Sequence, residues 1–166
     1  MKRTYLGCQV YNIAQQHDVP NTLVHRIITT YIEYLKECLF RGERIDIYGL
    51  VSIVPDVITA EYNKTLAYDC YIIADMLGLP RYTVYAIIKA YIEDAKASIM
   101  EGTIVELRSL VTIKPYLDSK GEKLVSVNSS VSQSLKNRLG TDGCVINSFR
   151  VHTYKVLREL LATNES

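Results

Sequence analysis

Residues 11–55 decide the fold, because the same stretch returns 60 positions later in the chain. The first copy is YNIAQQHDVPNTLVHRIITTYIEYLKECLFRGERIDIYGLVSIVP, and residues 71–115 are YIIADMLGLPRYTVYAIIKAYIEDAKASIMEGTIVELRSLVTIKP. The copies align without a gap. The identical pairs include Tyr11/Tyr71, Pro20/Pro80, Tyr31/Tyr91, Lys36/Lys96, Gly42/Gly102 and Pro55/Pro115. A match of this length indicates an internal duplication, so two copies of one supersecondary unit are predicted.

The first half of each copy has the pattern of two helices. Apolar residues at three- to four-residue steps predict a helix that includes Leu6 and Ala14, with Thr4 as its N-cap. Pro20 suits the first turn of a second, longer amphipathic helix. Gly42 lies just past its end, where a left-handed residue commonly closes a helix. The second copy repeats this pattern.

The second half of each copy has the pattern of a β-hairpin. After the glycine, apolar and polar residues alternate with a period of two, which is typical of half-buried strands. Residues 45–48 and 50–53 are predicted to form one strand pair, and residues 105–108 and 110–113 the other. Each pair is joined by a short turn.

The repeat also sets the expected domain organisation. We divide the chain into repeat 1 (1–55), a linker (56–65), repeat 2 (66–115) and an extension (116–166). One unit of about 45 residues cannot bury two helix stripes and a sheet face alone. We therefore expect the copies to pack against each other in a single α+β domain with pseudo-two-fold symmetry.

The order helix, helix ending in Gly, then a strand pair of pattern L-x-G-F-G-x-F resembles the HU/IHF family of histone-like DNA-binding proteins. The corresponding stretches are IYGLVSI (47–53) and LRSLVTI (107–113). The resemblance covers residues 4–55 and 64–115, and more loosely a C-terminal strand and helix. It implies that this chain is both protomers of the family's dimer fused into one intramolecular pseudo-dimer, with a C-terminal β extension and a short helix.

The hairpins depart from the family pattern. Val51 and Val111 stand where the family has its second hairpin glycine, and Ser109 replaces the first glycine in repeat 2. Family members also extend a two-stranded arm whose proline tip kinks DNA from the minor groove. Only the extension has room for an arm, and it contains no proline after Pro115.

Within the extension, residues 124–127 and 144–147 read as strands, and residues 154–161 read as the terminal helix. The Ser-rich stretch 126–134 is either a flexible arm or an edge strand that pairs with a neighbouring subunit.

The charge of the chain gives a weak signal for DNA. The formal net charge is +1, so a strongly basic nucleic-acid coat is excluded. A mild basic excess occurs only in the extension. The candidate DNA-contact residues there are Lys120, Lys123, Lys136, Arg138, Arg150 and Lys155.

The sequence contains no pattern of an enzyme, a cofactor site or a metal site. Nucleotide-binding glycine motifs and HExxH are missing, and the four cysteines and three histidines are scattered. The cysteines are expected to be reduced and mostly buried. His25 is predicted to be a surface residue. Glu33 and Glu93 each precede a lysine by three residues, which predicts ordinary ion pairs on helix surfaces.

The 13 tyrosines are the unusual part of the composition, beside 2 Phe and no Trp. Tyr11, Tyr31, Tyr71 and Tyr91 fall on the predicted core stripes. Others fall at positions that should be partly exposed, where a half-wet protein interface is the favoured role. These candidate interface residues are Tyr34, Tyr48, Tyr62, Tyr82, Tyr85 and Tyr116.

Our first hypothesis is a non-catalytic architectural protein that uses an HU/IHF-like core for protein–protein assembly. Proteins similar to this family occur among the virion genes of crAss-like tailed phages. The resemblance thus implies a ring or connector component near the portal and tail, with a homo-oligomer or other virion proteins as partners. The location would be the virion and the host cytoplasm.

The alternative is a DNA-bending nucleoid protein that binds double-stranded DNA, located in the cytoplasm or nucleoid. A weaker option is an inhibitor that mimics a histone-like dimer. No apolar run reaches the roughly 18–20 residues of a membrane span, and the first residues lack a signal-peptide core, so no membrane partner is expected. Because no enzyme motif is found, no small-molecule substrate is expected either.

Overall fold

The chain has an α+β fold in this computed structural model, which describes residues 2–59, 64–122, 124–141 and 143–153. The helices are α1 (Leu6–His17), α2 (Asn21–Phe40), α3 (Leu66–Leu77), α4 (Arg81–Met100) and α5 (Gln133–Lys136). The strands are β1 (Ile45–Ile47), β2 (Val51–Pro55), β3 (Val105–Leu107), β4 (Val111–Leu117), β5 (Leu124–Val131) and β6 (Phe149–Thr153). The predicted order of helix, helix and hairpin is thus present in both repeats. The helix predicted over 154–161 lies outside the described residues.

The helices of the two repeats match in length and in the way they end. α1 and α3 each have 12 residues, and α2 and α4 each have 20. Gly42 and Gly102 follow the long helices with a φ of 84° each, as predicted for residues that close a helix in the left-handed conformation. The prediction of Thr4 as an N-cap is wrong. Its backbone N–H donates to the carbonyl of Ile104, so it ties the N-terminal segment to repeat 2.

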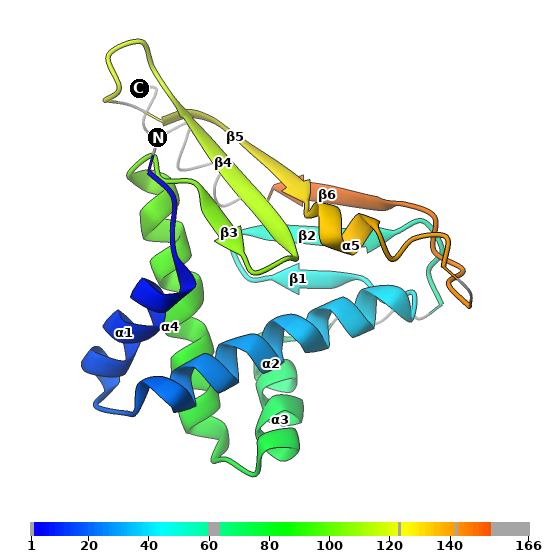
Figure 1. The fold of residues 1–166 in the computed structure, drawn as a ribbon, viewed down its shortest axis with the longest axis horizontal. Helices are drawn as coiled ribbons and strands as arrows, with labels where there is room; N and C mark the ends of the chain where they lie inside the picture. Colours follow the sequence, from blue (N-terminus) through cyan, green and yellow to red (C-terminus); the bar gives the residue numbers. More distant parts are fainter. Residues whose placement is uncertain (1, 60–63, 123, 142, 154–166) are drawn as a thin grey trace.

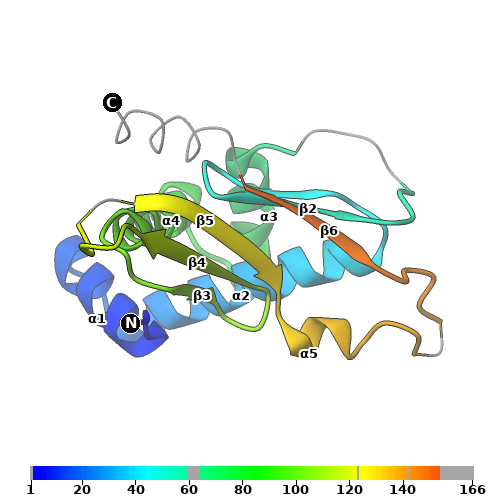
Figure 2. The ribbon, with the colours of Figure 1, turned by 90° about the horizontal axis from the view of Figure 1, so that it is seen from above.

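The strands form two antiparallel sheets of three strands each. Their orders are β1-β2-β6 and β3-β4-β5. Ile45 pairs with Ile53 in one hairpin and Val105 with Ile113 in the other, so the register is the same in both repeats. The sheets lie side by side over the helices, with β5 next to β6 (Figures 1 and 2).

The extension supplies the third strand of both sheets. β5 pairs with its neighbour in sequence, β4, whereas β6 pairs with β2 of repeat 1, almost 100 residues earlier in the chain. The strand predicted at 124–127 is confirmed. The one predicted at 144–147 is wrong, because that segment has no regular structure and its buried Ile146 anchors it instead. The strand of this part of the extension is β6, which starts at Phe149.

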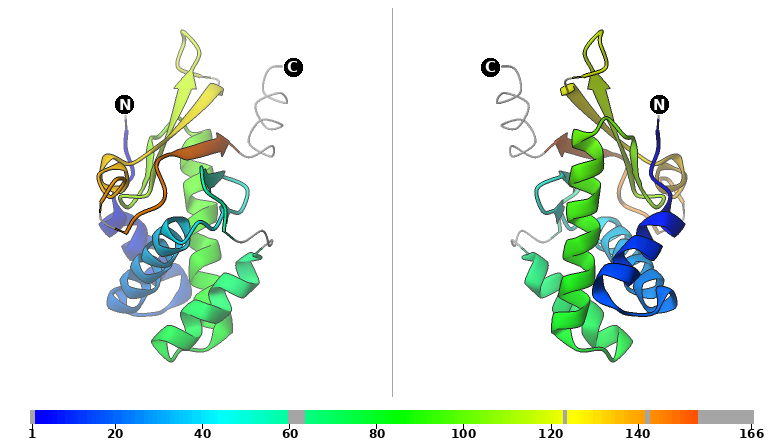
Figure 3. Two further views of the ribbon diagram at one scale, coloured as in Figure 1. Left: turned by 90° about the vertical axis from the view of Figure 1, so that its right-hand side faces the viewer. Right: turned by 90° about the vertical axis from the view of Figure 1, so that its left-hand side faces the viewer.

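One hydrophobic core joins the two repeats. It contains buried side chains of α1–α4 and of strands from both sheets. Besides packing within its own repeat, α1 packs on α4, and α3 packs on α2 (Figure 3). The largest fully buried side chains, Tyr31 and Tyr91, are equivalent residues of the two long helices, which confirms their predicted packing role.

Each long helix carries one lysine that reaches the hairpin turn of the other repeat, and the two lysines occupy equivalent positions. The Lys36 ammonium donates to the Ser109 hydroxyl in the turn of repeat 2. The Lys96 ammonium lies so close to Gly49, in the turn of repeat 1, that a Cβ at residue 49 would clash with it. The predicted ion pairs are confirmed, at 3.0 Å from Lys36 to Glu33 and 3.3 Å from Lys96 to Glu93. The lysines therefore also make contacts between the repeats, beyond a surface role.

Among the described residues, none of the helices combines the length and apolar character that crossing a bilayer requires.

Candidate interaction surfaces

The described candidate DNA-contact residues do not form one cluster. Lys120 lies in the turn after β4, and Lys136 lies in α5, beyond the far end of β5. A strand of eight residues separates them by about 25 Å. The turn is not purely basic either, because the Asp118 carboxylate accepts the Lys120 backbone N–H at 3.2 Å. Arg150 is exposed on β6 of the other sheet. Lys123 and Lys155 lie outside the described residues.

Arg138 holds the extension onto α2. Its Nη2 donates to a carboxylate oxygen of Glu37 at 3.2 Å, and its guanidinium lies 3.9 Å from the centre of the Phe40 ring. Phe40 in turn packs edge-on against Phe149 of β6, with 5.6 Å between the ring centres. Arg138 thus has a structural partner for both its charge and its planar face, which leaves it little capacity for a phosphate.

The candidate interface tyrosines are divided among three places. Tyr48, Tyr82 and Tyr85 are 63%, 78% and 39% exposed, in the first hairpin turn and at the start of α4. Tyr116 is exposed on β4, and Tyr34 is half-buried between α2 and α3. Tyr62 lies outside the described residues.

Two further tyrosines are exposed against expectation. The prediction that Tyr11 and Tyr71 pack in the core is wrong, since they are 55% and 40% exposed. In α1 the buried residues are Gln9, Val10, Ile13 and Ala14, so residue 11 points away from them. Identity between the repeats shows that two positions are equivalent. It does not show on which side of the helix they lie.

Three cations of α4 lie over tyrosine rings. The Arg81 guanidinium is 3.9 Å from the centre of the Tyr71 ring, the Lys89 ammonium is 5.9 Å from that of Tyr85, and the Lys96 ammonium is 5.0 Å from that of Tyr48. Contacts of this length lie within the range of cation–π interactions. We call this surface the aromatic–cationic face, and it comprises Tyr48, Tyr71, Tyr82, Tyr85, Arg81, Lys89 and Lys96. The spacing of the three cations, at steps of eight and seven residues along one helix, could have revealed it from the sequence.

A pocket of about 540 Å³ continues this face. Tyr48 and Tyr85 line it together with Arg44 and with residues 64–67, which lead into α3. Arg44 is paired with Asp46 at 3.2 Å. The hairpin turn of repeat 1 and the helix pair of repeat 2 therefore share one surface.

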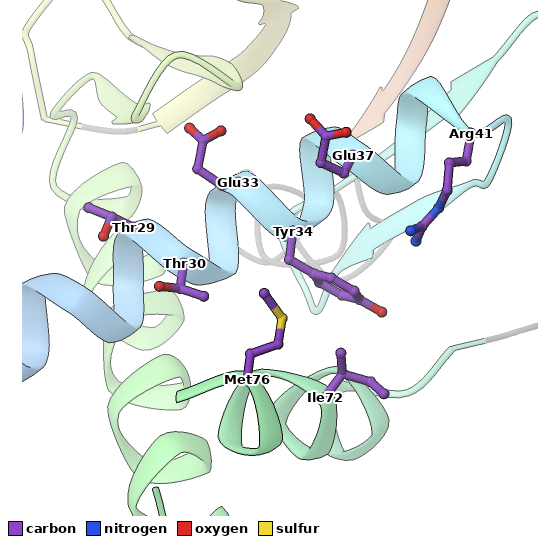
Figure 4. A pocket seen from close by; sticks show the side chains of 8 residues that line it. All are labelled: Thr29, Thr30, Glu33, Tyr34, Glu37, Arg41, Ile72 and Met76. Atoms are coloured by element: carbon purple, nitrogen blue, oxygen red, sulfur yellow. The ribbon is translucent and has the colours of Figure 1, made fainter. Parts of the chain in front are cut away.

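A second pocket, of about 450 Å³, lies between α2 and α3 (Figure 4). It is lined by Thr29, Thr30, Glu33, Tyr34, Glu37, Arg41, Ile72 and Met76. Its two acidic groups are already in ion pairs, Glu33 with Lys36 and Glu37 with Arg138. The pocket therefore offers apolar contact area with a polar rim.

A partly buried polar cluster connects the end of α2 to the start of α3. Lys64 donates to Glu43 at 2.9 Å and to the Cys38 sulfur at 3.3 Å. Arg41 contacts the same two partners, at 2.9 Å and 3.3 Å. These charge-assisted contacts hold the chain where the first repeat passes into the second.

Asp69 of α3 lies within electrostatic reach of this cluster. It is buried, and its Oδ1 atom has no hydrogen-bond partner in the part of the chain that is described. Burial raises its pKa from 3.8 to about 6, although Tyr34 and the Lys64 charge act in the opposite direction.

The described residues contain no group of three or more His, Cys, Asp or Glu side chains that could hold a metal ion. His25 is exposed as predicted, with Arg108 Nη1 at 3.4 Å from its Nε2. Of the cysteines, Cys38 and Cys70 are buried, Cys144 is half-buried and Cys8 is exposed. The expectation of mostly buried thiols therefore fails for Cys8, which lies on the outer side of α1.

A scan of the chain against protein-family models finds no match, and neither does a search of curated proteins.

Proposed function

We propose that this chain is a non-catalytic architectural protein, with an HU/IHF-like pseudo-dimer as its core, that works by protein–protein assembly. In this proposal it is a structural ring or connector component in the portal–tail region of a phage virion. Its location is then the virion and, before assembly, the host cytoplasm.

The observation that carries the proposal is the path of the extension. A DNA-kinking arm needs a free two-stranded ribbon. Here residues 111–131 form a β-hairpin whose base lies in the second sheet, and the described part of 132–153 returns to complete the first. The far end of that hairpin is held to the body as well. Leu124 is buried, and Leu117 lies so close to Gly102 that a Cβ there would be 2.7 Å from its Cδ1.

The distribution of charge supports the same proposal. Wrapping DNA requires several cations on one continuous surface, each near a phosphate. Lys120 and Lys136 lie beyond opposite ends of β5, Arg150 lies on β6 of the other sheet, and Arg138 is paired with Glu37. By contrast, exposed tyrosines are concentrated around α3 and α4, and tyrosine is enriched in protein interfaces.

The test is to measure assembly and DNA binding on the same protein. Sedimentation velocity over a range of concentrations, with negative-stain electron microscopy, should show a discrete oligomer. Anisotropy of a fluorescein-labelled DNA duplex in about 50 mM salt should show no binding. A monomer at every concentration would contradict the assembly role. DNA affinity that falls steeply with salt would instead favour the DNA-bending alternative.

A further inference from the structure

The aromatic–cationic face is continuous across three elements. Tyr82, Tyr85, Lys89 and Lys96 lie on one side of α4, because their spacing follows the helical repeat. The face extends to Tyr71 on α3 through Arg81, as described above. It reaches the first hairpin turn through the pocket that Tyr48 and Tyr85 share.

Two of its cations are available to a partner. Lys96 is paired with Glu93 at 3.3 Å. Within the described residues, Arg81 and Lys89 make no salt bridge. The Arg81 guanidinium lies over the Tyr71 ring, and a guanidinium can bind a carboxylate with two parallel hydrogen bonds.

The fold itself does not require this face, as the equivalent side of repeat 1 shows. The shift of 60 residues gives the residue of the other repeat at each position of the face. The pairs are Arg81/Asn21, Tyr85/His25, Lys89/Thr29 and Tyr48/Arg108. That side therefore has one tyrosine, Tyr11, where the aromatic–cationic face has several. Since repeat 1 forms the same elements with polar residues at these positions, the packing of the repeats does not explain the aromatic side chains.

We infer that the aromatic–cationic face binds an acidic segment of a partner protein, with its carboxylates at Arg81 and Lys89 and its apolar side chains on the tyrosine rings. This inference rests on the proposed assembly function and adds the surface and the chemistry of the partner. A protein segment fits better than a nucleic acid, because a short segment can place two carboxylates at Arg81 and Lys89 alone, whereas a continuous chain of phosphates would also pass the carboxylates of Asp46 and Glu93. The partner needs only two carboxylates, spaced to match two cations that are eight residues apart on α4.

The test uses the full chain and a short fluorescein-labelled peptide of repeated Glu-Glu-Leu. The matched control peptide has Gln in place of Glu. Fluorescence anisotropy should show binding of the acidic peptide and not of the control, and the affinity should fall as salt rises from about 50 to about 300 mM. The double variant Arg81→Ala/Lys89→Ala should weaken binding about tenfold, as expected for two partly exposed charge contacts.

The matched control variant is Arg26→Ala/Lys114→Ala. It removes the same charge from exposed positions on α2 and β4, and Lys114 also lies over a tyrosine, with its ammonium 5.4 Å from the ring centre of Tyr116. This control should bind the acidic peptide like the unchanged protein. Circular dichroism should show that both variants remain folded.

Four results would overturn the inference. The acidic peptide could fail to bind, or both double variants could weaken binding equally. A thymidine oligonucleotide could bind more tightly than the peptide and lose affinity in Arg81→Ala/Lys89→Ala, which would assign the face to single-stranded nucleic acid. Self-association that is lost in this variant and blocks the peptide would assign it to a second copy of the chain. Duplex DNA binding that is unchanged in Arg81→Ala/Lys89→Ala would instead contradict the proposed function and leave this face unaffected.

Discussion

Replacing Asp69 with asparagine should stabilise the protein at neutral pH. Asp69 is buried on α3, and one of its carboxylate oxygens lacks a hydrogen-bond partner in the described structure. Asparagine has nearly the same size and keeps one oxygen, and it carries no charge to desolvate. The substitution should therefore remove the cost of burying a carboxylate while retaining the packing of α3 on α2.

The magnitude follows from the change in pKa on folding. The folded-state pKa of about 6 lies above the ordinary value of 3.8, so the folded protein binds more protons between these values. Stability must therefore fall as the pH rises through this window, and the full cost is present above it. A pKa difference of about two corresponds to about 3 kcal/mol. We expect Asp69→Asn to stabilise the protein by about 2–3 kcal/mol at a pH of about 7.5, and by about 1 kcal/mol at a pH of about 4.5.

The assay is urea unfolding followed by far-ultraviolet circular dichroism, since the chain has no Trp to report by fluorescence. Asp75→Asn is the control, because Asp75 is an exposed carboxylate on the same helix. It should change stability by less than about 0.5 kcal/mol at either pH. The reasoning is refuted if Asp69→Asn destabilises the protein at neutral pH, or if its effect does not depend on pH.

Three other outcomes test the packing of the repeats. Gly102→Ala should lower the free energy of unfolding by about 1–2 kcal/mol, measured by urea unfolding. Residue 102 has a φ of 84°, and the new Cβ would lie 2.7 Å from a methyl carbon of Leu117 in β4. An unchanged unfolding midpoint would contradict the closeness of that contact. Lys36→Met keeps the aliphatic part of the side chain and removes the ammonium that donates to Ser109. The same assay should show a loss of about 1–2 kcal/mol in the free energy of unfolding. No loss would mean that this contact between the repeats does not contribute to stability. In the native protein, the exposed Cys8 should react with a thiol reagent and the buried Cys70 should not, since burial raises the pKa of Cys70 to about 12. Mass spectrometry of the labelled peptides measures both reactions. Early labelling of Cys70 would show that α3 opens readily.

The helices and hairpins could be read from the sequence because their signals are local. An apolar stripe, a proline at the start and a glycine after the end describe α2 without reference to any other part of the chain. The change to a period of two after Gly42 likewise marks the first hairpin. The duplication strengthened each prediction, since two diverged copies keep the same pattern.

The candidate surfaces were only partly predictable. Tyr48, Tyr82 and Tyr85 were selected because they fall outside the apolar stripes, and the structure exposes them. Arg81 and Lys89 were not selected, because charge was counted along segments of sequence. The packing of α3 on α4 places Arg81 beside Tyr71, and a count of charges does not contain it. Lys89 lies one helical turn after Tyr85 on α4 itself, so that pair could be found from the sequence.

The sequence alone determined the repeated unit of two helices and a hairpin, because backbone preference and hydrophobic period act between residues a few positions apart. Tertiary structure alone decided where the extension goes. β6 pairs with a strand almost 100 residues earlier, and the apolar segment 144–147 gave as strong a strand signal as the true strand at Phe149–Thr153. The pairing of β6 depends on a partner that is distant in the chain. The open edge of β2 therefore determines which segment of the extension becomes the third strand.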